Sequence, residues 1–312
     1  MEKNNYLFIF AAVLMVLIAV LATNLFEREE TNPDVMASFY PFYDITQRIS
    51  GEEIDVEPLV PPGTEPHSFE LSPSDRMKVE DAKVFISTGV SFERWEEEVT
   101  DSVDTRIVDS SKGIELLEAE HEHSHDHDEG NDHHDHEHYG DYDTHYWVSP
   151  TNAKIIAENI KEALIEEFPE KSEEIERNAE QFMGEMDRLD EEFETRLSGC
   201  DKDTIVTAHA AFAYLGNDYD FSQVPIHGIS PMSEPTPSQI EEIIKVTEEK
   251  ELQYIFYEEL VDPRVAENIA EESGVETLVL NPVAGSVDGA EGYVPIMERN
   301  LGNLERALEC SP

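Results

Sequence analysis

Residues 172–197 read SEEIERNAEQFMGEMDRLDEEFETRL, and their apolar side chains recur at every third or fourth position. These apolar positions are Ile175, Ala179, Phe182, Met186, Leu189, Phe193 and Leu197. The spacing places all of them on one face of a single α-helix of about seven turns. The pattern therefore predicts a long helix that buries one face in a core, with Gly199 as its stop signal.

Short apolar runs alternate with amphipathic segments on both sides of this helix. Strands are expected at 35–40, 54–60, 83–87, 204–207, 252–257 and 277–280. Helices are expected at 75–81, 150–168, 237–249, 263–273 and 293–308. Such alternation is typical of parallel sheets covered by helices. We predict an α/β fold in which two Rossmann-like lobes with mostly parallel sheets are joined by a long rigid helix.

The predicted domain boundaries follow from these elements. An N-terminal segment covers residues 1–31, and an N-terminal α/β lobe covers residues 32–169. The lobe includes an acidic, histidine-rich loop at 118–142. A linker helix at 170–199 and a C-terminal α/β lobe at 200–312 complete the chain.

The N-terminal segment indicates a membrane-associated location. Tyr6 to Ala22 are 17 apolar residues without interruption, which is about the length that spans a bilayer core. A retained anchor and a cleaved signal segment are both compatible with this run. The length of the run and the lack of a clear cleavage site favour the anchor. We expect the remaining chain to be extracytoplasmic and attached to the cell membrane.

The two cysteines, Cys200 and Cys310, fit an oxidising compartment. They are too far apart in sequence for a metal knuckle, and they could form a disulfide that closes a loop of about 110 residues. Two separate buried thiols are the alternative.

The composition is strongly acidic. The chain of 312 residues has 71 Asp and Glu against 21 Lys and Arg, which gives a formal charge of −50. Phosphate backbones would be repelled by such a surface, so binding to nucleic acid is excluded. The hydrophobic fraction of 39% still provides a core, and most of the acids read as a solvated coat.

Eight of the 12 histidines lie in one low-complexity run, together with seven acids. They are His121, His123, His125, His127, His133, His134, His136 and His138. Neutral imidazole binds Zn²⁺, Cu²⁺ and Ni²⁺, and the acids raise the local cation concentration. We interpret the run as an auxiliary loop that collects metal. A solvated acidic linker with incidental histidines is the alternative.

The other four histidines are His67, His145, His209 and His227. His67 and His209 follow predicted strands, and ligands of open α/β sheets bind beyond the carboxyl ends of strands. Three imidazoles that converge on a cleft would form a zinc site with one open position. Spacing alone does not establish that convergence. We read His227 as structural, and Trp95 and Trp147 as packing residues. Hydrogen-bonded or solvated carboxylates are the more common role for the glutamates near the expected cleft, which are Glu65, Glu234, Glu258 and Glu259.

Several motifs resemble those of the zinc/manganese solute-binding proteins of ABC importers, over about residues 35–310. In the first half they are Ser38-Phe-Tyr-Pro-Phe-Tyr43, Leu59-Val-Pro-Pro-Gly-Thr-Glu-Pro-His-Ser-Phe-Glu70, Gly89-Val-Ser-Phe-Glu-Arg-Trp95 and His145-Tyr-Trp-Val-Ser-Pro150. In the second half they are Thr207-Ala-His-Ala-Ala-Phe-Ala-Tyr214, Ile229-Ser-Pro-Met-Ser-Glu-Pro-Thr-Pro-Ser238 and Leu280-Asn-Pro-Val283.

The resemblance implies that His67, His145 and His209 hold the metal between the lobes. Manganese-type members are similar but carry a carboxylate where His209 stands, so imidazole favours zinc. Related zinc proteins often have an acid near the position of Ala284. Here a water or Asp288 is the expected fourth ligand.

The resemblance therefore implies an extracytoplasmic receptor, not an enzyme, that delivers Zn²⁺ to an ABC importer. Its expected partners are the permease and its ATPase, and the receptor is expected to be a monomer. The alternatives are a receptor for manganese or another divalent metal and a surface adhesin of the same fold. A zinc hydrolase is disfavoured because the chain has no clear general-base motif such as His-Glu-x-x-His.

Overall fold

The computed structural model describes residues 32–90, 92, 94–119, 142–232, 235–285 and 291–311. The predicted anchor or signal segment and the histidine run 121–138 lie outside these ranges. Within the ranges, no helix is long and apolar enough to cross a membrane. The two sheets belong to one compact unit, which begins at Asp34.

Two four-stranded parallel sheets form the framework, which confirms the predicted fold class. The first sheet has the order β2-β1-β3-β4 and consists of β1 (Val35–Ala37), β2 (Val56–Pro58), β3 (Val84–Ser87) and β4 (Arg106–Asp109). The second has the order β6-β5-β7-β8 and consists of β5 (Thr204–Thr207), β6 (Ser222–Pro225), β7 (Tyr254–Tyr257) and β8 (Glu276–Val279). The first sheet with its helices is the first lobe below, and the second sheet with its helices is the second lobe.

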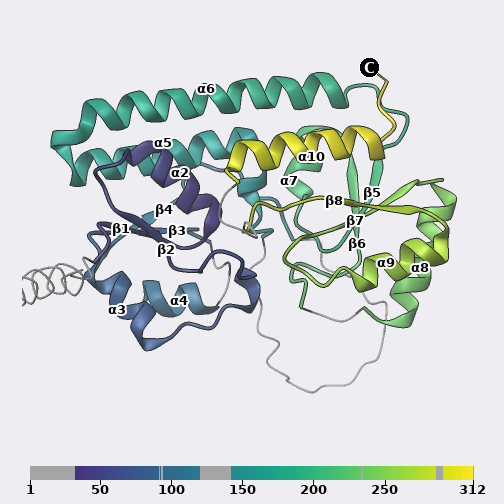
Figure 1. The fold of residues 1–312 in the computed structure, drawn as a ribbon, viewed down its shortest axis with the longest axis horizontal. Helices are drawn as coiled ribbons and strands as arrows, with labels where there is room; N and C mark the ends of the chain where they lie inside the picture. The colour runs from purple at the N-terminus through teal and green to yellow at the C-terminus, as the bar shows by residue number, and fades with distance from the viewer. Residues whose placement is uncertain are drawn as a thin grey trace, which may run out of the picture. The chain divides into compact units, whose positions relative to one another are not determined.

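Helices cover the sheets (Figure 1). The first lobe has α2 (Tyr40–Ser50), α3 (Pro73–Asp81), α4 (Arg94–Thr100), α5 (Pro150–Glu167) and the short 3₁₀ helices η1 (Pro66–Ser68) and η2 (Tyr146–Val148). The second lobe has α7 (Ala213–Asp218), α8 (Pro237–Glu249), α9 (Arg264–Ser273) and α10 (Tyr293–Ala307). Because helices shield both faces of a parallel sheet, central strands such as β3 are buried along their length.

The long helix is α6 (Ser172–Leu197), which η3 (Pro169–Lys171) precedes. Its buried residues are Ile175, Ala179, Phe182, Met186, Leu189, Phe193 and Leu197, which are the seven predicted positions. The helix packs on α2 and α5 of the first lobe and, toward its C-terminal end, on α10 of the second lobe, so it joins the two lobes (Figure 1).

Several elements differ from the expected pattern. The first strand ends at Ala37 and not at residue 40, because Tyr40 starts α2 with Pro41 in its first turn. The expected pattern also lacked the edge strands β4 and β6 and the helices α2, α4 and α7. Only Val108 is buried in β4, and β6 has no fully buried residue, so neither has the apolar run of a central strand.

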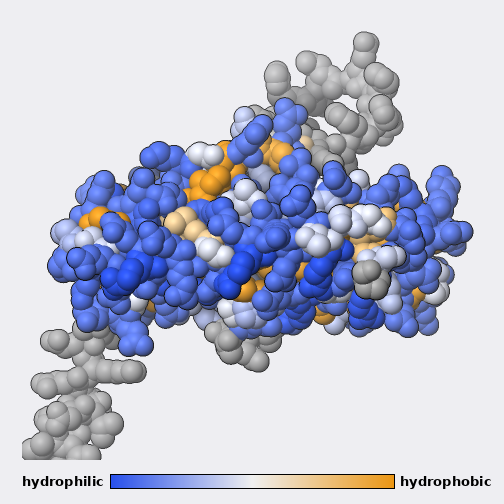
Figure 2. Space-filling model, turned by 90° about the horizontal axis from the view of Figure 1, so that it is seen from above, coloured by the Kyte–Doolittle hydropathy of each residue, from blue (hydrophilic) through white to orange (hydrophobic). Residues whose placement is uncertain are grey.

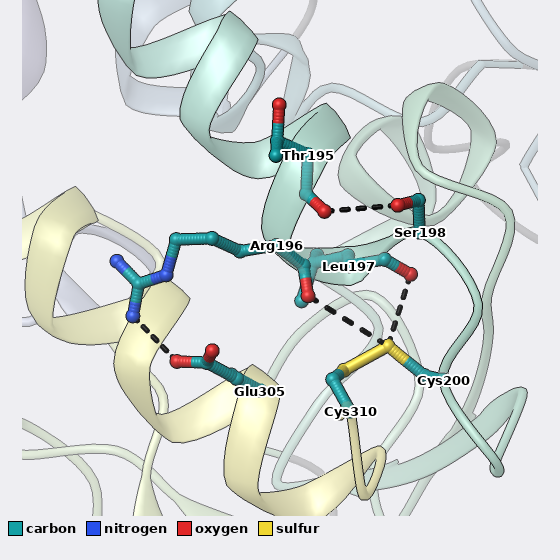
Figure 3. Close-up of a disulfide and its surroundings, with 7 residues drawn as sticks. All are labelled: Thr195, Arg196, Leu197, Ser198, Cys200, Glu305 and Cys310. Carbon is teal, nitrogen blue, oxygen red and sulfur yellow. Dashed lines mark hydrogen bonds and ion pairs between the residues drawn. A yellow bond between two sulfur atoms is a disulfide. The ribbon is translucent and has the colours of Figure 1, made fainter. Parts of the chain in front are cut away.

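The structure contains the predicted disulfide between Cys200 and Cys310. It ties the chain just beyond α6 to the segment just beyond α10 (Figure 3). Beside it Arg196 pairs with Glu305 at 2.5 Å, and Lys202 N donates to the Leu308 carbonyl at 3.0 Å. The disulfide therefore fixes the C-terminal segment to the end of the long helix.

The surface over α6 is mostly hydrophilic (Figure 2). On α6 the positions between the buried residues are mainly acidic, and several, such as Glu191 and Glu192, are exposed. This arrangement agrees with a solvated acidic coat around an ordinary apolar core.

Candidate metal centre

Each of the three histidines lies just beyond a strand or at the start of a helix. His67 belongs to η1, after β2 and the turn at Gly63. His145 precedes η2, which leads directly into α5. His209 follows β5, one of the two central strands of the second sheet. The first lobe therefore contributes two imidazoles and the second lobe contributes one.

The structure brings these three imidazoles together. The Nε2 atom of His145 lies 3.3 Å from the Nε2 atom of His67 and 3.3 Å from that of His209. All three side chains offer ligand atoms within 4.8 Å of one another. Two nitrogens 3.3 Å apart, each about 2.05 Å from a common ion, subtend an angle of roughly 107° at that ion. This angle is close to tetrahedral, so the geometry suits zinc.

Buried carboxylates orient two of the rings. Asp143 Oδ1 lies 2.8 Å from His145 Nδ1 and also accepts the His145 backbone N–H at 2.8 Å. Glu258 Oε1 lies 2.6 Å from His209 Nδ1. A carboxylate accepts the proton on Nδ1, which leaves the lone pair of Nε2 to face the other imidazoles. His145, His209 and both carboxyl groups are almost fully buried, and His67 is half-buried.

Burial governs the protonation of His209 and Glu258, the hydrogen-bonded pair of the second lobe. It holds the pKa of His209 well below its usual range, and the nearby His67 lowers it further. Burial raises the pKa of Glu258 to about 8. Both shifts favour uncharged groups, so His209 keeps a free lone pair at neutral pH. A dication held by the imidazoles would favour the ionised form of Glu258.

A small cavity lies between the lobes and borders Glu258, the carboxyl partner of His209. Glu65 lines it from the first lobe, and Glu258, Asn281 and Ala284 line it from the second. Its volume is about 10 Å³, which is roughly the space of one water. Burial raises the pKa of Glu65 to about 7, with Glu258 adding to the shift. Two carboxyl groups with raised pKa values, Glu65 and Glu258, therefore line this cavity between the lobes.

The other residues named from the sequence have different positions. Glu259 accepts from Arg299 at 2.7 Å and from Asn281 at 2.9 Å. The side chains of Trp95 and Trp147 are buried, and their indole N–H groups donate to Pro66 at 3.1 Å and Pro282 at 2.8 Å. Glu234, Asp288 and the eight histidines of the run lie outside the described residues.

Sequence reasoning missed the role of Asp143. Its signal was available, because it stands two residues before His145, but many aspartates precede histidines in this chain. The second lobe also holds this segment, since Tyr214 donates to the Asp143 carbonyl at 2.7 Å. Nearby, Ser149 donates to Asp218 at 2.6 Å. These bonds connect the His145 segment to the lobe that carries His209.

Comparison with known proteins places this geometry in context. The family model described as "Zinc-uptake complex component A periplasmic" matches residues 35–307. The chain is 32% identical over 289 residues to the zinc-binding lipoprotein AdcA of Streptococcus pneumoniae, a match that covers 88% of this chain and 56% of AdcA. The chain thus spans about half the length of the AdcA relatives that it matches. It is also 32% identical to the high-affinity zinc uptake system protein ZnuA of Bacillus subtilis, with 98% of each chain covered.

Solved structures share the fold. The laminin-binding protein Lmb of Streptococcus agalactiae, described as a bifunctional protein with adhesin and metal-transporting activity, superposes with a TM-score of 0.76 at 29% identity. That match covers 88% of this chain and 99% of Lmb. The Zn(II)-bound ZnuA-like domain of Streptococcus pneumoniae AdcA superposes with a TM-score of 0.73 at 30% identity, and covers 89% of this chain and 99% of the domain.

Proposed function

The chain belongs to the family of zinc-uptake component A proteins, and from this membership we propose that it is an extracytoplasmic receptor that binds Zn²⁺ and delivers it to an ABC importer. It acts as a transport receptor and not as an enzyme. Its partners are the permease of that importer, with its ATPase, and it works as a monomer. The apolar run in residues 6–22 anchors it to the cell membrane or directs its export.

One observation carries this proposal above the others. The Nε2 atom of His145 lies at near-tetrahedral spacing from those of His67 and His209, which come from different lobes, and buried carboxylates orient two of the three rings. We propose His67, His145 and His209 as the protein ligands of the transported ion. Water or Asp288 supplies the fourth ligand. We predict lobes at 32–169 and 200–312 with a linker at 170–199, and we propose that the ion binds at the junction of the two lobes.

Ligand chemistry favours zinc as the cargo. Three neutral nitrogen ligands suit Zn²⁺ well, whereas Mn²⁺ is better served by carboxylate, carbonyl and water oxygens. The names of the AdcA and ZnuA relatives refer to zinc. A manganese receptor would be expected to carry more oxygen ligands than this site offers.

The test is calorimetric titration of the purified extracytoplasmic chain with Zn²⁺. We expect one tight site, and His209→Ala should weaken it by more than the roughly 100-fold that the loss of an outer ligand partner causes. His67→Ala and His145→Ala should act alike, with unchanged far-ultraviolet circular dichroism. Tight zinc binding that survives all three substitutions would refute the assignment. Turnover of a hydrolase substrate that His209→Ala abolishes would point to a zinc enzyme instead.

We propose that the histidine run 121–138 collects zinc for this site or senses its abundance. Its imidazoles and acids can bind zinc weakly, because ligands on a low-complexity segment must be ordered on binding. Deletion of residues 121–138 should leave the tight site and abolish the binding of additional, weakly held zinc ions. Unchanged stoichiometry after deletion would contradict the role.

A second function, adhesion, is favoured by one observation, the similarity to Lmb and its described adhesin activity. Laminin binding by the purified chain that persists in the triple histidine variant would support this role independently of zinc.

A further inference from the structure

Phe92 packs against the first-lobe side of the three histidines. It lies in the connection between β3 and α4, and its side chain is 3% exposed. Its ring centroid lies 4.6 Å from that of His67 and 6.3 Å from that of His145. Trp147 continues the apolar surface, at 5.5 Å from Phe92 and 5.2 Å from His145. Both first-lobe imidazoles are therefore backed by aromatic rings.

The connection that carries Phe92 is fixed at Thr88. Glu96 of α4, which is buried, accepts the Thr88 backbone N–H at 2.8 Å and its hydroxyl at 2.5 Å. Tyr146, the neighbour of His145, donates to the Thr88 carbonyl at 2.5 Å. Phe92 also stacks on Phe39 at 4.8 Å. These contacts hold the ring in place, so it is a fixed wall.

This wall limits how many ligands an ion can have. With three imidazoles bound, a tetrahedral ion needs one more ligand, and an octahedral ion needs three. The aromatic surface of Phe92 and Trp147 offers no ligand atom, and both side chains are buried against the two imidazole rings. The cavity beside Glu65 and Glu258 has the volume of about one water. Among the described residues, aromatic rings therefore cover the first-lobe side of the histidines, and the cavity that borders Glu258, the partner of His209, can hold one further ligand.

We propose that Phe92 is a specificity-determining residue, which excludes water from the first-lobe histidines and so restricts the bound ion to four ligands. This favours Zn²⁺ over ions that require six, such as Mn²⁺. The inference rests on the proposed zinc-receptor function and concerns how that site discriminates between ions. Phe92 acts through the histidines and through the space that it occupies, not as a ligand.

The experiment uses Co²⁺ as a spectroscopic substitute for Zn²⁺. Four-coordinate Co²⁺ absorbs visible light strongly, and six-coordinate Co²⁺ absorbs weakly. The wild-type chain should give the strong spectrum. Phe92→Ala, which opens space for water, should give a weaker spectrum and should lose roughly tenfold or more of the Zn²⁺-over-Mn²⁺ preference measured by competition. Phe92→Leu, which keeps an apolar side chain, should restore most of both properties.

Phe193→Ala is the matched control. Phe193 is also a buried phenylalanine, but it belongs to α6 and stacks on Tyr219 away from the histidines. This variant should lose stability and keep the wild-type cobalt spectrum. A wild-type spectrum and ion preference in Phe92→Ala would overturn the inference while leaving the proposed function intact. Failure of the wild-type chain to bind Zn²⁺ or Co²⁺ would remove the proposed function itself, and the inference with it.

Discussion

Replacing Glu258 with glutamine should weaken zinc binding by roughly 10- to 100-fold and leave the fold intact. Glu258 Oε1 lies 2.6 Å from His209 Nδ1, and the side chain is 4% exposed. Glutamine has the same shape and can still reach the imidazole. It has no negative charge, however, so it polarises the ring less and offers no compensation to a bound dication.

The magnitude follows from the hydrogen bond. A hydrogen bond to a charged group contributes about 1.5–3 kcal/mol, and a neutral one contributes about 0.5–1.5 kcal/mol. The difference of about 1–1.5 kcal/mol corresponds to roughly a tenfold change in Kd. The lost attraction between the carboxylate and the ion adds to this figure. Since burial raises the pKa of Glu258 to about 8, a neutral side chain is already tolerated here without metal.

Competition with a chromophoric zinc chelator at neutral pH measures the change, and thermal unfolding of the metal-free chain measures stability. Glu248→Gln is the matched control, because it removes one negative charge from an exposed position of α8. The control should bind zinc like the wild type. Equal zinc affinities for Glu258→Gln and the wild type would refute the idea that this carboxylate orients His209 and stabilises the bound ion by its negative charge. An equal loss in the control would assign the effect to overall charge.

Three further outcomes are expected from the structure. Burial raises the pKa of Glu96 to about 7, above its unfolded value of about 4.5, so the ionisation of Glu96 costs stability as pH rises from about 4.5 through 7. Glu96→Gln should therefore stabilise the chain by up to about 3 kcal/mol at pH 8 and by almost nothing at pH 4, as measured by urea unfolding at both values; a pH-independent difference would contradict this. The double variant Cys200→Ser, Cys310→Ser should lose about 4–5 kcal/mol, because the disulfide closes a loop with a sequence separation of 110; calorimetry of the variant and of the wild type should show a lower melting temperature, and equal values would count against the entropic account. Gly184→Ala should raise the free energy of unfolding, measured by urea unfolding, by roughly 0.5–1 kcal/mol, since Gly184 lies inside α6 and a Cβ there meets no atom within 4 Å. A lower free energy of unfolding in this variant would contradict the exposed position of Gly184 on the helix.

The sequence predicted best the elements whose burial is regular. The period of α6 specified all seven of its buried positions, because a long helix on a core repeats one signal many times. The edge strands β4 and β6 were missed because the side chains of a short edge strand are largely exposed and leave no apolar run. The start of α2 was misjudged because Phe39 and Tyr40 are apolar residues, which occur both at the end of a buried strand and at the start of a buried helix.

The site divides in the same way. The motifs around His67, His145 and His209 identified these residues as candidates, and the structure brings their side chains together. The pairing of Asp143 with His145 is local, yet nothing in the sequence distinguished this aspartate from the other acids. The pairing of Glu258 with His209 joins residues 49 positions apart, so it depends on the packing of β5 against β7. Such partners can be named only when the tertiary structure is known.

The aromatic residues around the histidines also give the protein an intrinsic fluorescence signal close to the metal ligands. The chain has two tryptophans, and both are buried in the first lobe. Trp147 contacts His145 and donates to Pro282 of the second lobe, and Trp95 donates to the carbonyl of Pro66, next to His67. Tryptophan emission from this chain therefore originates beside the metal ligands and at the junction of the lobes. A change at the metal ligands is therefore expected to change the tryptophan fluorescence of the unlabelled protein.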